Sequence, residues 1–347
     1  MANEIEDDHK YWEISCEKHH DNLTYQVFSF QDIAVIEKLI KFAPDFVLLK
    51  PNALSNENKR RYDEIVVLIN TLLNIPVFPD LPEILIYENK RIFSYWLKKH
   101  NIPHPQTHIV SDLKQIGPVI DILGFPIVAK ANIGASGRGV FILKDNTGLQ
   151  GYAKQVLLKN KIPQYEGSKN NKSGILKKLI WYLTHPGKAI IKIKVLKTQK
   201  SNTQYGFIIL QQFIPHNFEW RVVRIGDSFF AHKKMKANEK ASGSLIKEYG
   251  QPPIELLDFV KAITDKHKFY SQAVDVFETN EGEYLVNEMQ CLFGQSDPYQ
   301  MKINGKIGRY LYKNNQWVFE EGDFASNKCY DLRVEYVLRK MGVDIHP

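Results

Sequence analysis

The sequence predicts an α/β protein (α/β shading into α+β), because strand-like and helix-like patterns alternate along most of the chain. Short apolar runs typical of buried strands are separated by stretches whose apolar residues recur at helical spacing. In the second half, two pairs of apolar runs flank tight turns and predict antiparallel hairpins. With 347 residues, the chain is long enough for two or three hydrophobic cores.

The first unit that we expect is a small α/β domain over residues 1–82 that follows a frayed tail. Its patterns predict a strand, a helix, a buried strand and a second helix, at residues 25–30, 33–42, 46–49 and 62–73. A second unit over residues 83–150 begins with one long helix at 84–100, which carries Lys90 near its start. A strand from Thr107, a helix over 112–123 and a flap over 125–143 complete it.

The flap carries the first chemical signal. Lys130 closes an apolar strand, and Gly134, Gly137 and Gly139 follow before the chain returns as a strand. Glycine lets backbone N–H groups approach a polyphosphate closely, and Lys130 would bring a mobile positive charge to it. The loop leads into a strand and no Lys-Ser/Thr pair follows it, so the P-loop and dinucleotide-binding templates both fail. On these residues alone, a plain surface hairpin remains an equal alternative.

The positive charge is concentrated in one segment, residues 151–205. It holds twelve lysines, no arginine and one acid, which gives +11; because the whole chain carries +7, the rest carries −4. The charge is not spread over a face where bases would be read, so we expect no nucleic-acid partner. Residues 174–183 predict a basic amphipathic helix that either packs on the protein or contacts a membrane or an acidic polymer. We interpret the segment as a lysine-rich insert or connection.

The last unit covers residues 206–347. Its patterns predict strands at 207–215, 220–225, 229–235, 272–277 and 284–289, a loop at 236–250, and helices at 254–270 and 330–341.

Two carboxylates and an amide fall on the second hairpin of this unit. Asp275 lies on its first strand, and Glu288 and Gln290 lie two residues apart on its second strand, hence on one face. Such hard oxygen donors suit Mg²⁺. The apolar neighbours make both strands look buried, and buried carboxylates need a compensating partner. The alternative is a solvent-facing pair of acidic strands.

Bulk features favour a cytoplasmic protein. The three cysteines are widely spaced and odd in number, which fits a reducing compartment rather than a disulfide framework. The acidic N-terminus has no apolar core, so it does not resemble a signal peptide. No apolar run approaches the roughly 20 residues that span a bilayer.

Four motifs occur in the order seen in the ATP-grasp superfamily, which residues 83–295 resemble. They resemble the phosphate-covering hairpin, the strand whose backbone reads adenine, the acid-x-Arg strand and turn, and the metal site, at Pro126–Lys130, Gln211–Ile214, Glu219–Asp227, and Asp275 with Glu288-x-Gln290. The pattern is nearest to glutathione synthetases, D-alanine–D-alanine ligases and ribosomal-protein glutamate ligases. The resemblance implies a small N-terminal α/β domain followed by two subdomains that clasp ATP.

The resemblance also implies a role for each residue. ATP would be bound by Lys90, Lys130, Gly137, Gln211, Phe213, Ile214 and, through the ribose hydroxyls, Glu219. One or two Mg²⁺ ions would be held by Asp275, Glu288 and Gln290. Our candidates for stabilising the transferring phosphoryl group and the oxyanion are Arg221, Lys234 and Lys236. A solvated strand edge is the alternative for the two lysines, and loops 242–244 and 294–296 are candidates for lining the acceptor pocket.

The implied activity is an ATP- and Mg²⁺-dependent carboxylate–amine ligase. It would act on a small-molecule, glycan-precursor or peptide carboxylate and an amine, with the oligomeric state left open. Two alternatives are an ATP-grasp kinase for an anionic acceptor and a non-catalytic nucleotide-binding module. The chain departs from the family pattern at Gln212, where many relatives have glutamate, and at Gln290, where asparagine is usual and Pro-Gly normally follows. The insert is a third departure.

Overall fold

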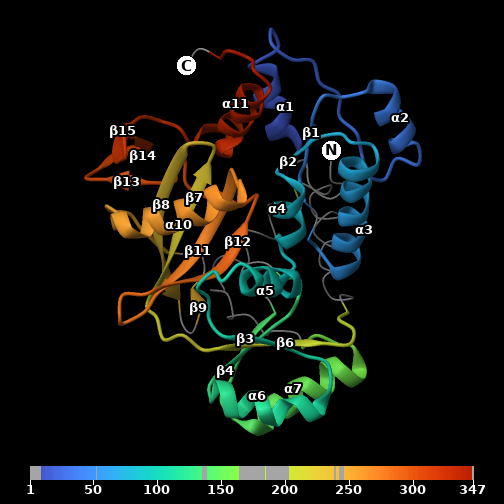
Figure 1. Cartoon of the computed structure of the whole chain (residues 1–347), viewed down its shortest axis with the longest axis vertical. Coiled ribbons are helices and arrows are strands. Elements are labelled where there is room, and N and C mark those ends of the chain that lie inside the picture. Colours follow the sequence, from blue (N-terminus) through green and yellow to red (C-terminus); the bar gives the residue numbers. More distant parts are fainter. Residues whose placement is uncertain are drawn as a thin grey trace.

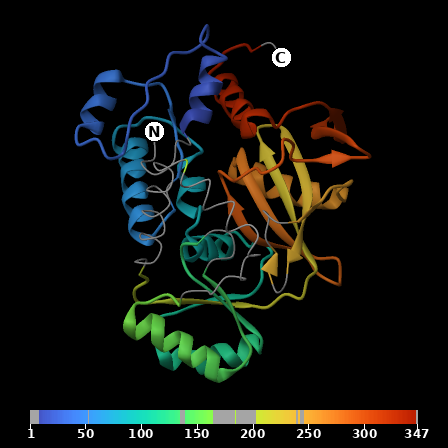
Figure 2. The same cartoon turned by 180° about the vertical axis from the view of Figure 1, so that it is seen from behind.

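The computed structural model describes residues 9–51, 53–134, 139–163, 184, 203–237, 240–241 and 246–345. Within these residues the strands form three sheets, of two, four and nine strands. Figure 1 shows the four-stranded sheet with its helices at the bottom, the nine-stranded sheet above it, and the N-terminal helices beside the larger sheet. The view from behind in Figure 2 shows the same arrangement.

The N-terminal unit is built around the two-stranded sheet. Its elements are α1 (Lys10–Glu17), α2 (Val35–Phe42), β1 (Val47–Leu48), α3 (Asn56–Val67), a π-helical turn (Leu68–Leu72) and β2 (Val77–Phe78), which pairs with β1 in parallel. α3 begins after Ser55, whose hydroxyl oxygen accepts a hydrogen bond from the backbone N–H of Asn58 at 3.1 Å.

The predictions for this unit are confirmed for the α2 helix and the β1 strand, but the strand predicted at residues 25–30 is wrong. The segment forms no strand: within it Ser29 alone is a bridge residue, and Phe28 packs against Phe42 of α2 with ring centroids 5.6 Å apart. Phe28 is thus buried against a helix and not in a strand of a sheet.

The long helix predicted at residues 84–100 is two helices, α4 (Leu81–Ile86) and α5 (Lys90–Lys99). Glu88 lies in the break with a left-handed backbone, at φ 50°. The side chain of Asn89 caps α5 by accepting from the N–H of Ile92 at 3.3 Å. The apolar spacing continues across the break, so periodicity alone could not reveal it.

The four-stranded sheet carries the flap. Its elements are β3 (Thr107–Val110), a 3₁₀ turn (Leu113–Gln115), α6 (Ile116–Leu123), β4 (Ile127–Lys130), β5 (Val140–Leu143), α7 (Asn146–Lys159) and β6 (Ile208–Gln212). The order is β3–β6–β4–β5, all antiparallel, and Lys130 pairs with Val140 across the flap hairpin. The predicted helix at 112–123 and the predicted flap strands are confirmed.

One face of this sheet is covered by α6 and α7 (Figure 1). Ile127 and Ala129 are fully buried in the core that α6 and α7 complete. Because successive strand residues point to opposite faces, Val128 and Lys130 project from the other face, on the side of α5 and the larger sheet.

The larger sheet and its flanking helices complete the chain. They are β7 (Phe218–Ile225), β8 (Ser228–Ala237), β9 (Lys240–Ala241), β10 (Lys247–Glu248), α10 (Ile254–His267), β11 (Ser271–Glu278), β12 (Tyr284–Gln290), β13 (Lys302–Ile303), β14 (Lys306–Lys313), β15 (Gln316–Glu321), a 3₁₀ turn (Ser326–Cys329) and α11 (Tyr330–Lys340). The main path is β12–β11–β7–β8–β14–β13, with β9 and β10 on β8 and β15 on β14.

The two predicted hairpins, β7–β8 and β11–β12, are confirmed, as are the helices at α10 and α11. The prediction that residues 236–250 form only a loop is wrong, because β10 pairs with β8 through Lys247 and Lys234. The meander β13–β15 was not predicted. α11 returns to lie beside α1 (Figures 1 and 2), where Trp12 meets Tyr330 edge-on at 4.6 Å.

The division into four units remains a proposal. α7 runs across the boundary placed at residue 150, and β6 pairs within the smaller sheet although it follows the boundary at 206. The amphipathic helix predicted at 174–183 lies outside the described residues. Among the helices that the structure describes, none combines the length and apolarity needed to cross a bilayer.

Candidate active site

Charged side chains from four neighbouring strands meet on one face of the larger sheet. The register places Glu288 opposite Asp275, Asp275 opposite Arg221, and Arg221 opposite His232. Two residues away on β7 and β8, Glu219 lies opposite Lys234. Directly opposed residues of an antiparallel pair project from the same face, so the sheet itself assembles this cluster.

Asp275 is the centre of the cluster. Its carboxylate accepts hydrogen bonds from Arg221 Nε at 2.7 Å, from Arg221 Nη2 at 2.9 Å and from Lys234 Nζ at 2.6 Å. Its side chain is 1% exposed. Burial alone would raise the pKa of Asp275, but the charges of Arg221 and Lys234 outweigh burial and hold that pKa well below its usual range. Asp275 is therefore ionised and fully engaged.

Lys234 connects Asp275 to the carboxylate predicted to bind ribose. Its ammonium group also donates to Glu219 Oε2 at 2.8 Å. Burial lowers the pKa of Lys234, but the charges of Asp275 and Glu219 raise it by more. The pKa of Lys234 therefore lies above its ordinary value. Lys234 is thus a fixed positive charge between two acids and not the solvated strand lysine of the alternative interpretation.

A bulge in β12 adds a residue that the sequence did not indicate. The register shifts after Asp275, so that Glu288 and Val286 find partners on β11 while Asn287 does not. Such a bulge re-aims a side chain. Asn287 Nδ2 donates to Glu219 Oε1 at 3.4 Å, on the same side as Glu288.

Asn287 joins the flap to the larger sheet. Lys130 Nζ donates to Asn287 Oδ1 at 2.9 Å, so the flap lysine lies beside the strand that carries Glu288. Burial, and next the charge of Lys90, lower the pKa of Lys130 to about 8. Glu288 and then Glu219 act in the opposite direction, so Lys130 is a buried lysine that lies among both lysines and acids.

Lys90 and Glu88 both contact the backbone of Gly134, at the start of the flap loop. Lys90 Nζ donates to the backbone carbonyl of Gly134 at 3.0 Å and lies 3.4 Å from Glu88 Oε2. The backbone N–H of Gly134 donates to Glu88 Oε2 at 3.4 Å. Gln290 Nε2 donates to Glu88 Oε1 at 3.1 Å. Sequence reasoning missed Glu88, although the Asn89 cap signal beside it marks the break that places it here.

Glu288 and Gln290 complete the cluster as predicted oxygen donors. Gln290 Oε1 also accepts from Arg221 Nη2 at 3.3 Å. Glu288 is half-buried and takes part in no hydrogen bond or ion pair within the described part of the chain. Burial, and next the charge of Glu88, raise the pKa of Glu288 to about 7. A carboxylate and an amide oxygen on one strand face are donor types that suit Mg²⁺.

A cation could not be held here by acids alone. In the residues that the structure describes, no three His, Cys, Asp or Glu side chains are grouped to hold a metal. Amide oxygens and substrate oxygens would therefore have to share the coordination, as is usual for Mg²⁺. The ligand role predicted for Asp275 would require it to exchange contacts with Arg221 or Lys234.

The residues predicted to contact adenine lie on the smaller sheet and just after it. Gln211 is buried and donates through Nε2 to Thr107 Oγ1 at 2.9 Å. A cavity of about 390 Å³ lies where β6 leaves the sheet, lined by Phe125, Pro126, Ile142, Lys144, Phe213 and Lys236. Lys236 Nζ lies 6.0 Å from the Phe213 ring centroid, away from the contacts of Asp275.

The remaining predicted residues lie elsewhere. Ile214 is buried beside Phe213. Gly137 and residues 242–244 lie outside the described residues. In the predicted acceptor loop, Ser296 accepts a hydrogen bond from Lys247 Nζ at 2.9 Å, and Asp297 accepts from the same ammonium at 2.8 Å.

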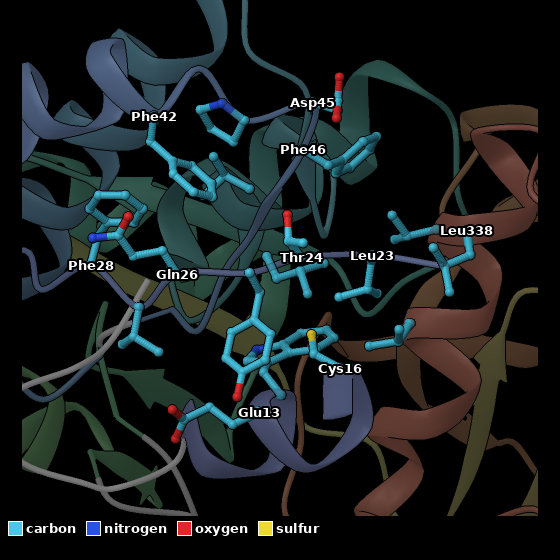
Figure 3. A pocket seen from close by; sticks show the side chains of 18 of the residues that line it. Glu13, Cys16, Leu23, Thr24, Gln26, Phe28, Phe42, Asp45, Phe46 and Leu338 are labelled. Carbon is cyan, nitrogen blue, oxygen red and sulfur yellow. The ribbon is translucent and has the colours of Figure 1, made fainter. Parts of the chain in front are cut away.

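A second cavity, of about 480 Å³, lies in the N-terminal part of the chain and shares no lining residue with this cluster (Figure 3). Its lining is largely apolar and comes from α1, residues 22–28, the α2–β1 connection and α11. Figure 3 shows Phe28, Phe42 and Leu23 around it, with the acids Glu13 and Asp45 at opposite ends.

No protein-family model and no curated protein matches the chain. Among solved structures, the D-alanine–D-alanine ligase of Bacillus anthracis is similar at a TM-score of 0.52 and 18% identity, covering 97% of this chain and 95% of that one. Carboxyaminoimidazole ribonucleotide synthase of Aspergillus clavatus, solved with ATP, is similar at 0.50 and 12%, covering 96% and 69%.

Similarity also extends to an N5-carboxyaminoimidazole ribonucleotide synthetase from Thermotoga maritima, at a TM-score of 0.47 and 17% identity, covering 92% of this chain but only 64% of that one. The chain spans 59% of a second such synthetase, solved with ADP. At these identities the comparisons establish the fold, and the match to the D-alanine–D-alanine ligase extends over nearly the whole chain. The chain has the ATP-grasp fold, as its motifs predicted.

Proposed function

We propose that the protein is an ATP- and Mg²⁺-dependent ligase that activates a carboxylate as an acyl phosphate and joins it to an amine. The observation that carries this proposal is the hydrogen bond from Lys130 of the flap to Asn287, beside Glu288. It brings a glycine-flanked cation and a carboxylate strand, 157 residues apart in the sequence, to one place. The structurally similar proteins include a D-alanine–D-alanine ligase solved with ATP, which supports the same class of activity.

In this proposal the two lysines receive the phosphates of ATP. Lys90 and Lys130 are near enough for the charge of one to lower the pKa of the other. A polyphosphate between them would relieve that repulsion and favour the charged form of Lys130. The cavity beside Phe213 would take the adenine ring, and Glu219 would accept from the ribose.

The cation would be held by Glu288 and Gln290, and Gln290 Oε1 would exchange its 3.3 Å contact with Arg221 for the cation. When bound, Mg²⁺ would neutralise charge on the transferring phosphoryl group. We assign Asp275 a different main task, because its three short contacts hold Arg221 and Lys234 in place. Those two cations would then stabilise anionic oxygens of the substrate without needing to reorganise.

The acceptor would be anionic, a carboxylate on a glycan precursor or an acidic peptide. The support is the charge of +11 over residues 151–205. The same charge favours the second candidate function, an ATP-grasp kinase that phosphorylates a hydroxyl of an anionic small molecule. The two differ in products: a ligase releases phosphate, whereas a kinase retains the phosphoryl group on its product.

The test is to incubate the protein with Mg-ATP and pooled acids and amines, and to measure free phosphate and product masses. The proposal predicts phosphate release only when both an acid and an amine are present, with a product lighter than its two parents by one water. Lys130→Ala should abolish the signal, and the matched control Lys114→Ala, at an exposed lysine of the same unit, should retain it. ADP formation without free phosphate would favour the kinase, and nucleotide binding without turnover would exclude both.

A further inference from the structure

We propose that the cavity of about 480 Å³ in the N-terminal part of the chain binds a hydrophobic ammonium compound, that is, an aliphatic or aromatic molecule that carries a positively charged amino group. The cavity shares no lining residue with the charged cluster, so its ligand would be a molecule other than ATP and the reacting substrates. The inference goes beyond the proposed function and does not depend on it.

The cavity has the size and the access of a small-molecule site. Pockets for such ligands have volumes of about 300–1,000 Å³ and mostly apolar walls. Four of the apolar side chains that line this cavity are 38–43% exposed, namely Tyr25, Val27, Phe42 and Met341. The cavity therefore reaches the surface through apolar residues, and grouped exposed apolar side chains mark places where another molecule binds.

Aromatic rings form much of the wall. Trp12, Tyr25, Phe28, Phe42 and Phe46 all line the cavity, and Figure 3 shows the three phenylalanines on it. The face of an aromatic ring carries partial negative charge, so rings grouped around a cavity attract an ammonium group as well as apolar parts of a ligand.

The charged side chains of the wall are all of one sign. Glu13 and Asp45 lie at opposite ends of the cavity (Figure 3), and none of the described residues that line it is a lysine or an arginine. The whole chain has 46 of these residues and a net charge of +7, so the cavity locally reverses the charge. Lys340, 5.7 Å from the Phe46 ring centroid, lies outside the lining and pairs with Asp80 at 3.6 Å. A cationic ligand would be attracted here, and an anionic one repelled.

Two acceptors at the wall lack a donor. The Nδ1 atom of His9 is buried and has no hydrogen-bond partner within the described part of the chain, while its Nε2 lies 3.8 Å from Glu13 Oε2. With the hydrogen on Nε2, Nδ1 is a free acceptor. The carboxylate of Asp45 makes no hydrogen bond or ion pair with another described residue. The N–H groups of an ammonium ligand would supply the donors that both side chains lack.

The experiment uses three probes with one carbon skeleton, 4-phenylbutylamine, 4-phenylbutanol and 4-phenylbutyrate, which are cationic, neutral and anionic at neutral pH. Each probe is titrated into the full-length protein by calorimetry at low salt. We expect the amine to bind about 10-fold more tightly than the alcohol, because only the amine gains from the rings and the acids. The carboxylate should bind more weakly than the alcohol. Added salt should weaken the amine and leave the alcohol unchanged.

Substitutions locate the binding. The double variant Glu13→Gln/Asp45→Asn should weaken the amine about 5-fold and leave the alcohol unchanged. The matched control is Asp21→Asn, which replaces an acid outside the lining whose side chain is 86% exposed, and it should retain the amine affinity. Thr24 is an exposed lining residue, so Thr24→Arg brings a positive charge to the cavity and should abolish amine binding, whereas Thr24→Leu should not.

Three results with the unaltered protein would overturn the inference: no binding of any probe, equal affinity for the amine and the alcohol, or tightest binding of the carboxylate. Unchanged amine affinity in the double variant and in Thr24→Arg would also overturn it, because the amine would then be bound elsewhere. If Thr24→Arg does not fold, the double variant decides, since Asp45 is exposed and Glu13 half-buried. None of these titrations contains ATP, so failure of the proposed function would be seen separately.

Discussion

Replacing Asp275 with asparagine tests how the charged cluster is held together. The substitution keeps the shape of the side chain but removes the charge that faces Arg221 and Lys234. Because Asp275 is 1% exposed, these two cations would be left buried with only Glu219 and neighbouring acids to balance them. Breaking a buried ion pair on one side costs about 3–5 kcal/mol. We expect Asp275→Asn to lower the free energy of unfolding by about 3 kcal/mol, at the lower limit because asparagine can still accept a hydrogen bond from Arg221.

Asp265 offers a matched control. It too has two cationic partners, Arg224 and Lys261, both at 2.6 Å, but its side chain is 38% exposed. Arg224 is buried, but without the Asp265 charge it keeps its hydrogen bonds to Gly226 O and Thr264 Oγ1. Since Asp265 itself is partly exposed, Asp265→Asn should cost less than Asp275→Asn, about 1 kcal/mol. Both variants can be compared in urea titrations followed by tryptophan fluorescence, since Trp220 is buried on β7 within the same sheet.

The effect of pH gives a second check. The pKa of Asp275 is lower in the folded protein than its ordinary value. Its contribution to stability is therefore complete above the pKa of the unfolded chain, about 3.9, and is lost as the pH falls through the folded pKa. The difference between the unaltered protein and Asp275→Asn should be constant from about pH 6 to 8 and should shrink only below about pH 4. A loss no larger than that of Asp265→Asn at neutral pH would refute this account of the cluster.

Two further predictions concern the lysines. Because the pKa of Lys130 is lowered to about 8, its charge is present below that pH and lost above it; the affinity for AMP-PNP should fall as the pH rises through about 8. Lys90→Met removes the second cause of that lowered pKa, so the pH at which AMP-PNP affinity falls should increase. If that pH does not change, the loss of affinity is due to the titration of another group. Deleting residues 164–202 should leave AMP-PNP affinity unchanged and weaken binding to polyglutamate about 10-fold at low salt. The deletion retains α7, whose Tyr152 and Val156 are buried in the core of the smaller sheet. Lys161 pairs with Thr203, so a short turn can join the two ends. Loss of AMP-PNP binding in this variant would contradict the assignment of the insert to acceptor binding.

Local signals predicted the parts of the fold that depend on neighbours in the sequence. The flap strands and the β7–β8 and β11–β12 hairpins follow from apolar runs around tight turns, and the structure confirms them. The strand expected at residues 25–30 failed because an apolar run shows that a segment is buried but not what covers it. Here Phe42 of α2 covers Phe28.

The site was predicted less completely than the fold, because its geometry is not local. Alternation along β12 correctly put Glu288 and Gln290 on one face, but the bulge that turns Asn287 toward Lys130 leaves no mark in the sequence. The cations that engage Asp275 come from two other strands, so their effect on its role became visible only with the sheet register. Asn89, a residue type that caps helices, indicated a break at Glu88. The prediction of one long helix followed the continuous apolar spacing instead.

The central claim is that a nucleotide is held between the flap lysine and the carboxylate strand. Calorimetric titration of Mg-AMP-PNP into the unaltered protein, Lys130→Ala, Glu288→Gln and the double variant measures this most directly. We predict that each single substitution weakens binding about 10-fold and that the two losses do not add, because both residues act on one phosphate–metal unit. Absence of binding by the unaltered protein, or unaltered affinity in both single variants, would contradict the claim.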